Sequence, residues 1–317
     1  MKVVALAGGV GGARLVDGLA QLLPGEDLTV VVNTGDDFEH LGLTICPDLD
    51  TVCYTLAGLA NPETGWGQAR ETWNALDSLA CLGGPTWFRV GDKDLGTHLE
   101  RTRRIRAGQC LSQVTRHFCR SWGIHLTVLP MSNDPVRTRV YTEEGELAFQ
   151  EYFVRRKCGP RVVGFLFEGI EHARPAPGVL SALNKTDLVV ICPSNPWVSV
   201  GPILALPGIR EILSSKTVVA ISPIIGGKAV KGPAAKMYQE MGIAPSALAV
   251  ARHYGSLLAG FVLDTSDSAL AGMISDLGIR TWATDILMRD RADRRRLAEE
   301  VIHFSEQLHL SRLEVIG

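Results

Sequence analysis

Short apolar stretches of strand length alternate along the chain with longer stretches of helical character. Several strand-length stretches are apolar without interruption, which is typical of parallel strands covered on both faces. The strand candidates are Val3–Ala7, Leu28–Val32, Leu126–Pro130, Val162–Phe167, Leu188–Cys192, Val218–Ser222, Gly260–Leu263 and Thr281–Ala283. Helices are expected over Pro177–Asn184, Pro202–Ser214, Gly232–Met241 and Ser268–Leu277. This alternation predicts an α/β protein with a Rossmann-like, doubly wound and mostly parallel sheet.

Two segments depart from the alternation. Residues 61–123 are rich in tryptophan and have mostly helical character, with glycine and proline at the joints. Residues 136–154 alternate with strand period on either side of a Glu-Glu-Gly-Glu turn, which predicts a β-hairpin of Val136–Thr142 with Leu147–Val154. We therefore expect a core formed by residues 1–60 and 124–317, and a helical insertion over residues 61–123 that caps the active site. A charged amphipathic helix over Asp290–Leu308 ends the chain.

The composition narrows the class of protein. The chain has 317 residues, of which 46% are hydrophobic and 21% charged, so a large core is expected and wholesale disorder is excluded. The net charge of −2 argues against a nucleic-acid-binding protein. Seven cysteines are scattered without a C-x-x-C pair, which is typical of free thiols in a reducing compartment and makes a cysteine zinc site improbable. Without an apolar run of membrane-spanning length or a leader sequence, a cytoplasmic location is expected.

A glycine-rich segment follows the first strand candidate directly. Its residues are Gly8, Gly9, Val10, Gly11, Gly12, Ala13 and Arg14. Glycines after a strand let the backbone approach an anionic group, and the helix that follows offers its first amides to that group. The segment matches neither the P-loop, which ends in Gly-Lys-Ser/Thr, nor the dinucleotide pattern, which needs Gly or Ala where Arg14 stands. The alternative is a turn that is rich in glycine for packing alone.

Carboxylates follow the second strand candidate. Asp36 and Asp37 lie in the loop after Leu28–Val32, and Asp50 heads a helix expected over Thr51–Leu59. Because the carboxyl ends of parallel strands meet at one edge of the sheet, these carboxylates are candidate ligands of a divalent metal and candidate catalytic groups. For Asp50, a helix N-cap is an equally good interpretation.

Two further clusters carry polar or aromatic side chains suited to ligands. Trp87, Phe88 and Arg89 suit a flat heteroaromatic ligand with a polar tail, although a core tryptophan beside a surface arginine is the plainer interpretation. Ser194 and Asn195 follow the Leu188–Cys192 strand candidate, where they could donate hydrogen bonds to a nucleotide.

The remaining candidates are basic. A second candidate anion-binding loop contains Gly226, Gly227, Lys228 and Lys231. Two phosphate-binding loops on one sheet favour a diphosphate ligand. A dense basic cluster, equally consistent with a solvated helix face or an anion site, consists of Arg101, Arg103, Arg104 and Arg106.

These motifs together resemble the CofD family, the 2-phospho-L-lactate transferases of coenzyme F-420 biosynthesis. The resemblance runs in order over essentially the whole chain. The segments that carry it are Gly8–Arg14, Asn33–Asp37, Pro47-Asp48-Leu49-Asp50-Thr51, Phe88-Arg89-Val90-Gly91-Asp92, Ser194-Asn195-Pro196 and Gly226–Pro233.

The resemblance implies a transferase that moves a phospho-lactyl, phospho-enolpyruvyl or phospho-glyceryl group from a guanosine diphosphate-linked donor to the ribityl hydroxyl of the deazaflavin Fo, releasing GMP. It also implies a need for Mg²⁺ and a homodimer, with no nucleic acid or membrane as partner. Asp50 and Arg89 match the family's Fo contacts, and Ser194, Asn195 and the Gly226–Gly232 loop would lie near the guanosine. Two alternatives are a non-catalytic regulator that binds UDP-sugars and an NAD-dependent oxidoreductase.

Overall fold

The computed structural model of the chain describes residues 1–316, so only the last residue of the predicted core, 317, lies outside it. Within this part of the chain, seven parallel strands form one sheet in the order β14-β13-β10-β9-β1-β2-β5. The strands are β1 (Val3–Ala7), β2 (Leu28–Val32), β5 (Thr127–Pro130), β9 (Leu188–Ile191), β10 (Thr217–Ile221), β13 (Gly260–Asp264) and β14 (Arg280–Thr284). The predicted doubly wound α/β fold is confirmed.

Helices cover both faces of this sheet, because successive side chains of each strand point to opposite faces. In β1, Val3, Ala5 and Ala7 pack on one face, whereas Val4 and Leu6 pack on the other. The first face is covered by α1 (Gly9–Ala20), α2 (Pro47–Leu56) and α12 (Arg291–Ile316), with α5 (Leu111–Ser121) beside them. The second face is covered by α6 (Val179–Lys185), α7 (Gly201–Ala205), α8 (Ile209–Leu213), α10 (Ala247–Tyr254) and α11 (Ala271–Ser275). The strands of this sheet are therefore mostly buried, as their apolar sequences predict, except the edge strand β14, in which Thr284 alone is buried.

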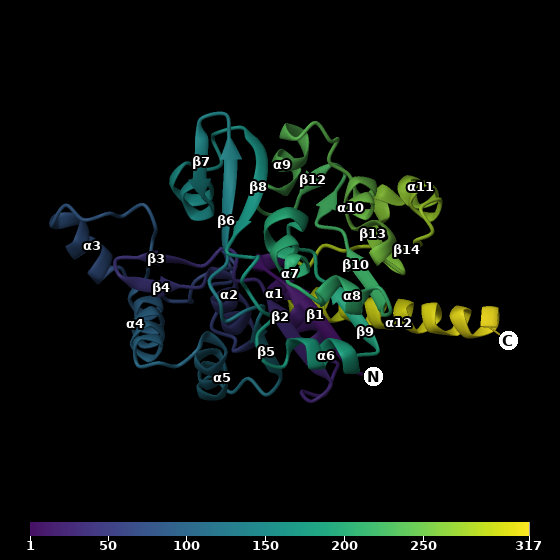
Figure 1. Cartoon of the computed structure of the whole chain (residues 1–317), viewed down its shortest axis with the longest axis horizontal. Helices are drawn as coiled ribbons and strands as arrows, with labels where there is room; N and C mark the ends of the chain where they lie inside the picture. Colours follow the sequence, from purple (N-terminus) through teal and green to yellow (C-terminus); the bar gives the residue numbers. More distant parts are fainter. Residues whose placement is uncertain (317) are drawn as a thin grey trace.

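The predicted helical insertion and the hairpin lie outside the sheet (Figure 1). Residues 61–123 contain α3 (Asn74–Cys81), α4 (Asp92–Arg106) and α5. The hairpin pairs β6 (Arg137–Thr142) with β7 (Gly145–Ala148), and β8 (Val162–Glu168) joins β6 on its other side in an antiparallel sheet. The strand candidate Val162–Phe167 thus belongs to this small sheet.

Two smaller hairpins and several short helices complete the fold. The hairpins are β3 (Phe38–His40) with β4 (Leu43–Ile45), and β11 (Ile224–Ile225) with β12 (Lys228–Ala229). The remaining helical segments are the π-helices η1 (Glu151–Arg155) and η2 (Pro196–Val200), the 3₁₀-helices η3 (Gly255–Leu257) and η4 (Thr265–Leu270), and α9 (Ala234–Glu240). Among residues 1–316, no helix has both the length and the apolar composition needed to cross a bilayer.

Several predicted boundaries are wrong, among them that of Ser268–Leu277, which covers the end of η4 and the short helix α11. The second hairpin strand ends at Ala148, and the residues predicted to continue it form η1. The helix expected over Pro202–Ser214 is split into α7 and α8, because Gly208 between them has a φ of 80°. The C-terminal helix extends beyond Leu308, to Ile316. The helix expected over Thr51–Leu59 starts earlier, at Pro47, whose fixed φ suits the first turn of a helix.

Candidate active site

One large cavity of about 710 Å³ lies at the carboxyl ends of the central parallel strands. Its walls come from the start of α1, from α2, from residues 64–67 and 87–98 of the insertion, from η1, and from the segments that follow β9, β10 and β14. This is the place where doubly wound proteins bind their ligands. The predicted site residues that line it are Gly8, Gly9, Gly11, Arg14, Asp36, Asp50, Trp87, Phe88, Arg89, Ser194, Asn195 and Lys231. Those that lie outside its lining are Gly12, Asp37, Gly226, Gly227 and Lys228.

The first glycine-rich segment belongs to the beginning of α1, where it packs closely on its neighbours. Gly9 is the first residue of the helix and has a φ of 63°, a left-handed conformation that glycine adopts at little cost. A Cβ on Gly11 would lie 2.3 Å from the carbonyl oxygen of Pro193, so no larger residue fits there without a backbone shift. Close packing thus accounts for Gly11. Gly8 and Gly9 line the cavity too, but their amides already donate to Ser194 Oγ and Asp48 Oδ1, and a Cβ on Gly8 would lie 2.6 Å from Asp48 Oδ2.

Asp48, which sequence reasoning did not single out, organises this end of the cavity. Its Oδ1 accepts a hydrogen bond from the Gly9 amide at 2.7 Å, and its Oδ2 accepts one from the Asn33 side-chain amide at 2.9 Å. Asn33 also accepts from the Gly35 amide at 2.8 Å and donates to the Val198 carbonyl at 3.2 Å. The carboxylate of Asp48 therefore ties the start of α1 to the loop after β2.

Four buried carboxylates lie near one another on this side of the cavity. Asp36, Asp37, Asp48 and Asp50 are each at most 6% exposed. Burial raises the pKa of Asp37 to about 7 and, despite the hydrogen bonds from Asn33 and Gly9, that of Asp48 to about 6. Burial and then repulsion from Asp48 raise the pKa of Asp36 well above its usual range. The cluster thus carries more negative charge than its surroundings compensate, which favours the binding of a cation or of protons.

Some oxygens of this cluster are free to bind a cation, although among the described residues the ligand atoms of Asp36, Asp37 and Asp50 do not all lie within 4.8 Å of one another. Among the described residues, Asp36 Oδ1, Asp37 Oδ1 and Asp50 Oδ2 are buried without a hydrogen-bond partner. Carboxylate oxygens are the protein ligands that Mg²⁺ prefers, and Asp36 and Asp50 both line the cavity. Asp37 lies behind them and is hydrogen-bonded to the thiol of Cys46. Asp36 is therefore the first candidate for a direct ligand and Asp37 for a supporting one, whereas Asp50, also predicted as a ligand, is already paired with the Arg101 cation, which would repel an ion.

The raised pKa of Asp37 predicts an unusual pH dependence of stability. An unfolded aspartate titrates near about 3.9, so between about pH 4 and about pH 7 the folded protein holds more protons than the unfolded one, and the free energy of unfolding falls as the pH rises. We expect Asp37→Asn to remove this loss, because a neutral amide can be buried at any pH. Without metal, in EDTA, the variant should melt higher than the wild type at pH 8 and by a clearly smaller margin at pH 5. Parallel melting-temperature curves against pH for the two proteins would contradict this expectation.

Asp50 lies in the first turn of α2 and is not its N-cap. Cys46 occupies the N-cap position, and the Asp50 amide donates to the Cys46 carbonyl at 3.0 Å. The N-cap interpretation of Asp50 is therefore wrong, because Pro47 starts the helix one turn earlier than predicted. The Asp50 Oδ1 atom accepts a hydrogen bond from the Arg101 guanidinium. Burial outweighs the attraction of Arg101 and raises the pKa of Asp50.

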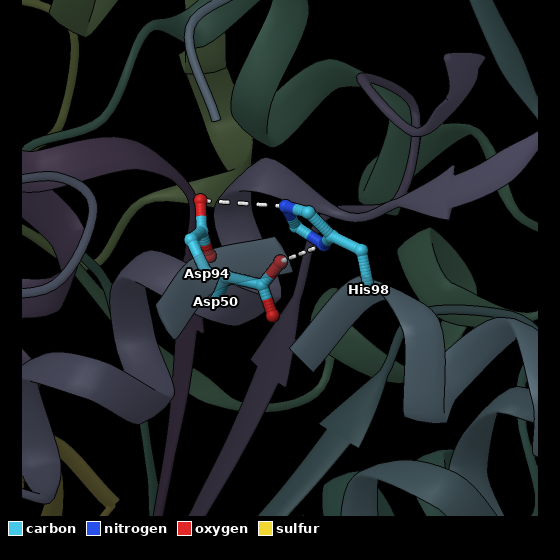
Figure 2. Close-up of side chains that lie close together, drawn as sticks. All are labelled: Asp50, Asp94 and His98. Atoms are coloured by element: carbon cyan, nitrogen blue, oxygen red, sulfur yellow. Dashed lines mark ion pairs between the residues drawn. The ribbon is translucent and has the colours of Figure 1, made fainter. Parts of the chain in front are cut away.

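Asp50, Asp94 and His98 form a close polar cluster (Figure 2). His98 Nδ1 lies 3.7 Å from Asp50 Oδ2, and His98 Nε2 lies 3.3 Å from Asp94 Oδ2. The Tyr54 hydroxyl donates to Asp94 Oδ1 at 2.6 Å. Burial acts against it, but hydrogen bonds from His98 and Tyr54 lower the pKa of Asp94. Sequence reasoning missed Tyr54, Asp94 and His98; the only signal was the spacing of Asp94 and His98 at i and i+4 on one helix.

The predicted basic cluster separates into different environments. Arg103 and Arg104 pair with Glu100 on the outer side of α4, as a solvated face would. Arg106 is exposed and donates to the Gly42 carbonyl at 2.8 Å. Arg101, in contrast, is 2% exposed and pairs with Asp50, so it belongs to neither of the predicted alternatives.

Aromatic side chains form the wall of the cavity next to the insertion. The rings of Trp87 and Phe88 lie 5.7 Å apart, and each packs on Phe38 and His40 of the β3–β4 hairpin. The Arg89 guanidinium lies over the ring of Trp73, 4.2 Å from its centroid, and Arg89 lines the cavity. This wall offers flat apolar surfaces and one cation, as the sequence predicts for a heteroaromatic ligand.

The opposite side of the cavity offers polar groups and cations. Ser194 Oγ accepts from the Gly8 amide at 3.2 Å and donates to the Gly8 carbonyl at 2.7 Å, so the glycine-rich segment already occupies this hydroxyl. Lys231 donates to the Thr64 carbonyl at 2.5 Å, which joins the second glycine loop to the insertion across the cavity mouth. Arg14 donates to the Met288 carbonyl at 2.9 Å.

The geometry of a hairpin turn explains why residues 226 and 227 are glycines. Their φ values are 55° and 76°, and they form the two-residue turn of the β11–β12 hairpin. A two-residue hairpin turn with positive φ at both positions favours glycine. Of the predicted second anion loop, the stretch Val230–Pro233 lines the cavity, and Lys231 is its cation.

Comparison with known proteins agrees with this geometry. Residues 3–298 match the family model described as "2-phospho-L-lactate transferase CofD". A phosphoenolpyruvate transferase of Streptomyces griseus subsp. griseus is 45% identical over 316 residues, which cover 97% of this chain and 99% of the relative. A 2-phospho-L-lactate transferase of Methanosarcina acetivorans is 41% identical over 300 residues, covering 95% and 98%.

A solved structure shares the fold at much lower identity. A UPF0052-family protein of Bacillus halodurans superposes with a TM-score of 0.61 at 17% identity, over 95% of this chain and 98% of that one. The match of the family model over nearly the whole chain, together with these identities, establishes that the protein is a transferase of the 2-phospho-L-lactate transferase CofD family.

Proposed function

We propose that this enzyme transfers a phosphate-linked three-carbon acid from a guanosine diphosphate-linked donor to the terminal ribityl hydroxyl of the deazaflavin Fo. The observation that carries the proposal is the arrangement of one cavity. An aromatic wall with Arg89, buried carboxylates with unpartnered oxygens, and a glycine-rich end with Arg14 and Lys231 all face the same space. A flat acceptor, a reacting phosphate and a nucleotide diphosphate need these three environments side by side.

The reaction requires one bond to form and one to break. The acceptor hydroxyl oxygen attacks the phosphorus that bears the acid, the phosphoanhydride bond breaks, and GMP leaves with the bridging oxygen. Asp50 is placed to orient this hydroxyl and accept its proton, because its Oδ2 is free of hydrogen-bond partners among residues 1–316. Mg²⁺ held by Asp36 and, in support, Asp37 would neutralise charge on the transferred phosphate and leave Asp50 Oδ2 to the hydroxyl. Because the Gly8 and Gly9 amides are already bonded to Ser194 and Asp48, the next residues of α1, Val10 and Gly11, together with Arg14 and Lys231, would bind the diphosphate and stabilise the leaving group.

For the three-carbon acid, we propose enolpyruvate. The basis is the similarity to phosphoenolpyruvate transferases, which are 44% and 45% identical to this chain in Streptomyces coelicolor and Streptomyces griseus subsp. griseus. The name of the Methanosarcina relative makes lactate the alternative to test beside it. A homodimer in the cytoplasm remains part of the proposal, and light scattering of the purified protein tests the dimer.

Mass spectrometry of the product tests the proposed function. Purified enzyme is incubated with Mg²⁺, Fo and one guanylylated acid at a time, with enolpyruvyl, lactyl and glyceryl donors in parallel. We expect a phosphodiester of Fo and an equal amount of GMP, formed fastest with the enolpyruvyl donor. Absence of any Fo ester with all three donors would refute the function, and faster reaction with another donor would refute only the choice of acid.

Nucleotide binding separates this function from the two alternatives. GDP at a hundredfold excess over its dissociation constant should stabilise the fold by about 2.7 kcal/mol. NAD and UDP-sugars at the same concentration should raise the melting temperature much less. A larger shift with NAD would favour an oxidoreductase, and a larger shift with a UDP-sugar would favour a regulator.

Arg89→Ala is expected to weaken Fo binding by about ten- to a hundredfold, because one charge-assisted hydrogen bond to the ligand's polar edge is lost. Arg89 is exposed and lies on the cavity wall, so the substitution should not change the melting temperature. Fluorescence titration with Fo measures the affinity. Arg103→Ala, an exposed arginine on α4 outside this cavity, is the matched control and should bind Fo like the wild type. Equal affinities of the two variants would remove Arg89 from the acceptor site.

A further inference from the structure

The helical insertion places three polar side chains on one face of α4. Asp94, His98 and Arg101 are spaced at i, i+4 and i+7, which brings them onto the same side of a helix. His98 is 1% and Arg101 is 2% exposed, although α4 as a whole is rich in charged residues. Burial of a guanidinium is costly unless its donors are satisfied and its charge is paired. The burial of these polar side chains on one face of α4 therefore has to be explained by their partners.

The Arg101 guanidinium donates hydrogen bonds to three residues. It donates to Asp50 Oδ1 on α2, to His98 Nδ1 at 3.1 Å, and to the Thr44 carbonyl of β4 at 3.2 Å. Because arginine only donates, His98 Nδ1 must be an acceptor, and the imidazole hydrogen lies on Nε2, which faces Asp94. The contacts thus determine the tautomer of His98 and the orientation of the Asp50 carboxylate together.

The guanidinium also explains why this cluster differs from the metal candidates. Asp50, Asp94 and His98 have ligand-type atoms within 4.8 Å of one another. However, the Arg101 cation already contacts two of these three residues, so a metal ion placed among them would be repelled by it. Arg101 takes one oxygen of Asp50 and leaves Oδ2 unpartnered.

We infer that Arg101, together with His98, is a positioning residue that holds Asp50 with Oδ2 available to the acceptor hydroxyl. This inference rests on the proposed transfer reaction. It gives the insertion a second role: the same segment that carries Trp87–Arg89 on the acceptor wall also sets the geometry of the carboxylate on α2. Arg101 acts through Asp50 and does not contact substrate.

A double-mutant cycle tests whether Arg101 acts through Asp50. We expect Arg101→Gln to lower kcat by about 10²-fold, since a displacement of about 1 Å in a reacting group can cost that much. In an Asp50→Asn background the same substitution should cost no more than about twofold, because the group that Arg101 positions is already inactive. Arg103→Gln, on the exposed side of α4, is the matched control and should keep the wild-type kcat.

A purely structural role predicts a different result. If Arg101 only joins α4 to α2, its substitution lowers the melting temperature and leaves kcat per folded molecule unchanged in the wild-type background; that result, or a loss of kcat that is equally large in the wild-type and Asp50→Asn backgrounds, would overturn the inference. If Arg101→Gln does not fold, His98→Gln is measured in the same cycle, and its loss of kcat must likewise vanish in the Asp50→Asn background. A wild-type enzyme that forms no Fo ester refutes the proposed function itself, whereas an active wild type with an additive cycle refutes only the role of Arg101.

Discussion

Asp50→Asn is expected to lower kcat by about 10²-fold or more and to weaken Fo binding by less than tenfold. The asparagine keeps the size of the side chain and can still accept a hydrogen bond from Arg101, but it lacks the second basic oxygen. In the wild type this oxygen, Oδ2, is buried without a hydrogen-bond partner among the described residues, on the wall of the cavity. Single-turnover transfer and fluorescence titration of Fo separate the rate from the affinity.

The substitution also breaks a buried ion pair, which by itself destabilises a protein. Asp17→Asn is the matched control, because Asp17 is 4% exposed and pairs with Arg294 at 3.2 Å, between α1 and α12 and outside the cavity lining. Asp17→Asn should lower the melting temperature and leave kcat unchanged. Transfer by Asp50→Asn at the wild-type rate would remove Asp50 from the mechanism.

The parallel sheet was predictable because the sequences of its central strands are almost wholly apolar. β1 and β9 are apolar throughout and β2 and β10 each contain a single threonine, which burial on both faces explains. β8 was harder to place, since VVGFLFE is also apolar, yet its side chains alternate in burial and it pairs in an antiparallel sheet. Which sheet a strand joins depends on its partners, and these are not encoded in its own sequence.

The candidate site was predictable where a motif follows a strand. Gly8, Asp36 and Ser194 come just after β1, β2 and β9, and all three line the cavity. Arg101 was not predictable in this way, because it lies among other arginines on a helix that looks solvated. Only the packing of α4 against α2 distinguishes it from Arg103, two residues later.

Two local sequence signals give conflicting predictions for the start of α2. Asp50 was a reasonable N-cap candidate, because aspartate favours that position, but proline at the first helical position signals the start more strongly. With Pro47 at the start of α2, Asp48 and Asp50 both lie in the first turn of the helix. Asp48 binds the Gly9 amide, and Asp50 is paired with Arg101.

The second large effect is expected from Asp36→Ala with Asp37→Ala, which should lower the transfer rate by about 10²-fold or more if these carboxylates hold Mg²⁺. Removing two buried, unpartnered oxygens relieves repulsion with Asp48, so the metal-free variant should be no less stable than the wild type at pH 8. Mn²⁺ binding followed by electron paramagnetic resonance gives a readout that does not depend on activity: the wild type should bind the ion and the variant should not.

Stability, Mn²⁺ binding and transfer rate together show whether Asp36 and Asp37 hold a metal or only stabilise a turn. Asp36 and Asp37 follow Gly35, whose amide is held by Asn33, so the turn has a support independent of both carboxylates. If the two residues served the turn alone, the variant would melt lower, still bind Mn²⁺, and keep its rate per folded molecule. If they hold the metal, the wild type loses its activity in EDTA and regains it with Mg²⁺, whereas the variant stays slow at any Mg²⁺ concentration. Wild-type transfer that persists undiminished in EDTA would exclude a metal from the reaction and leave Asp36 and Asp37 as acids that share protons with Asp48.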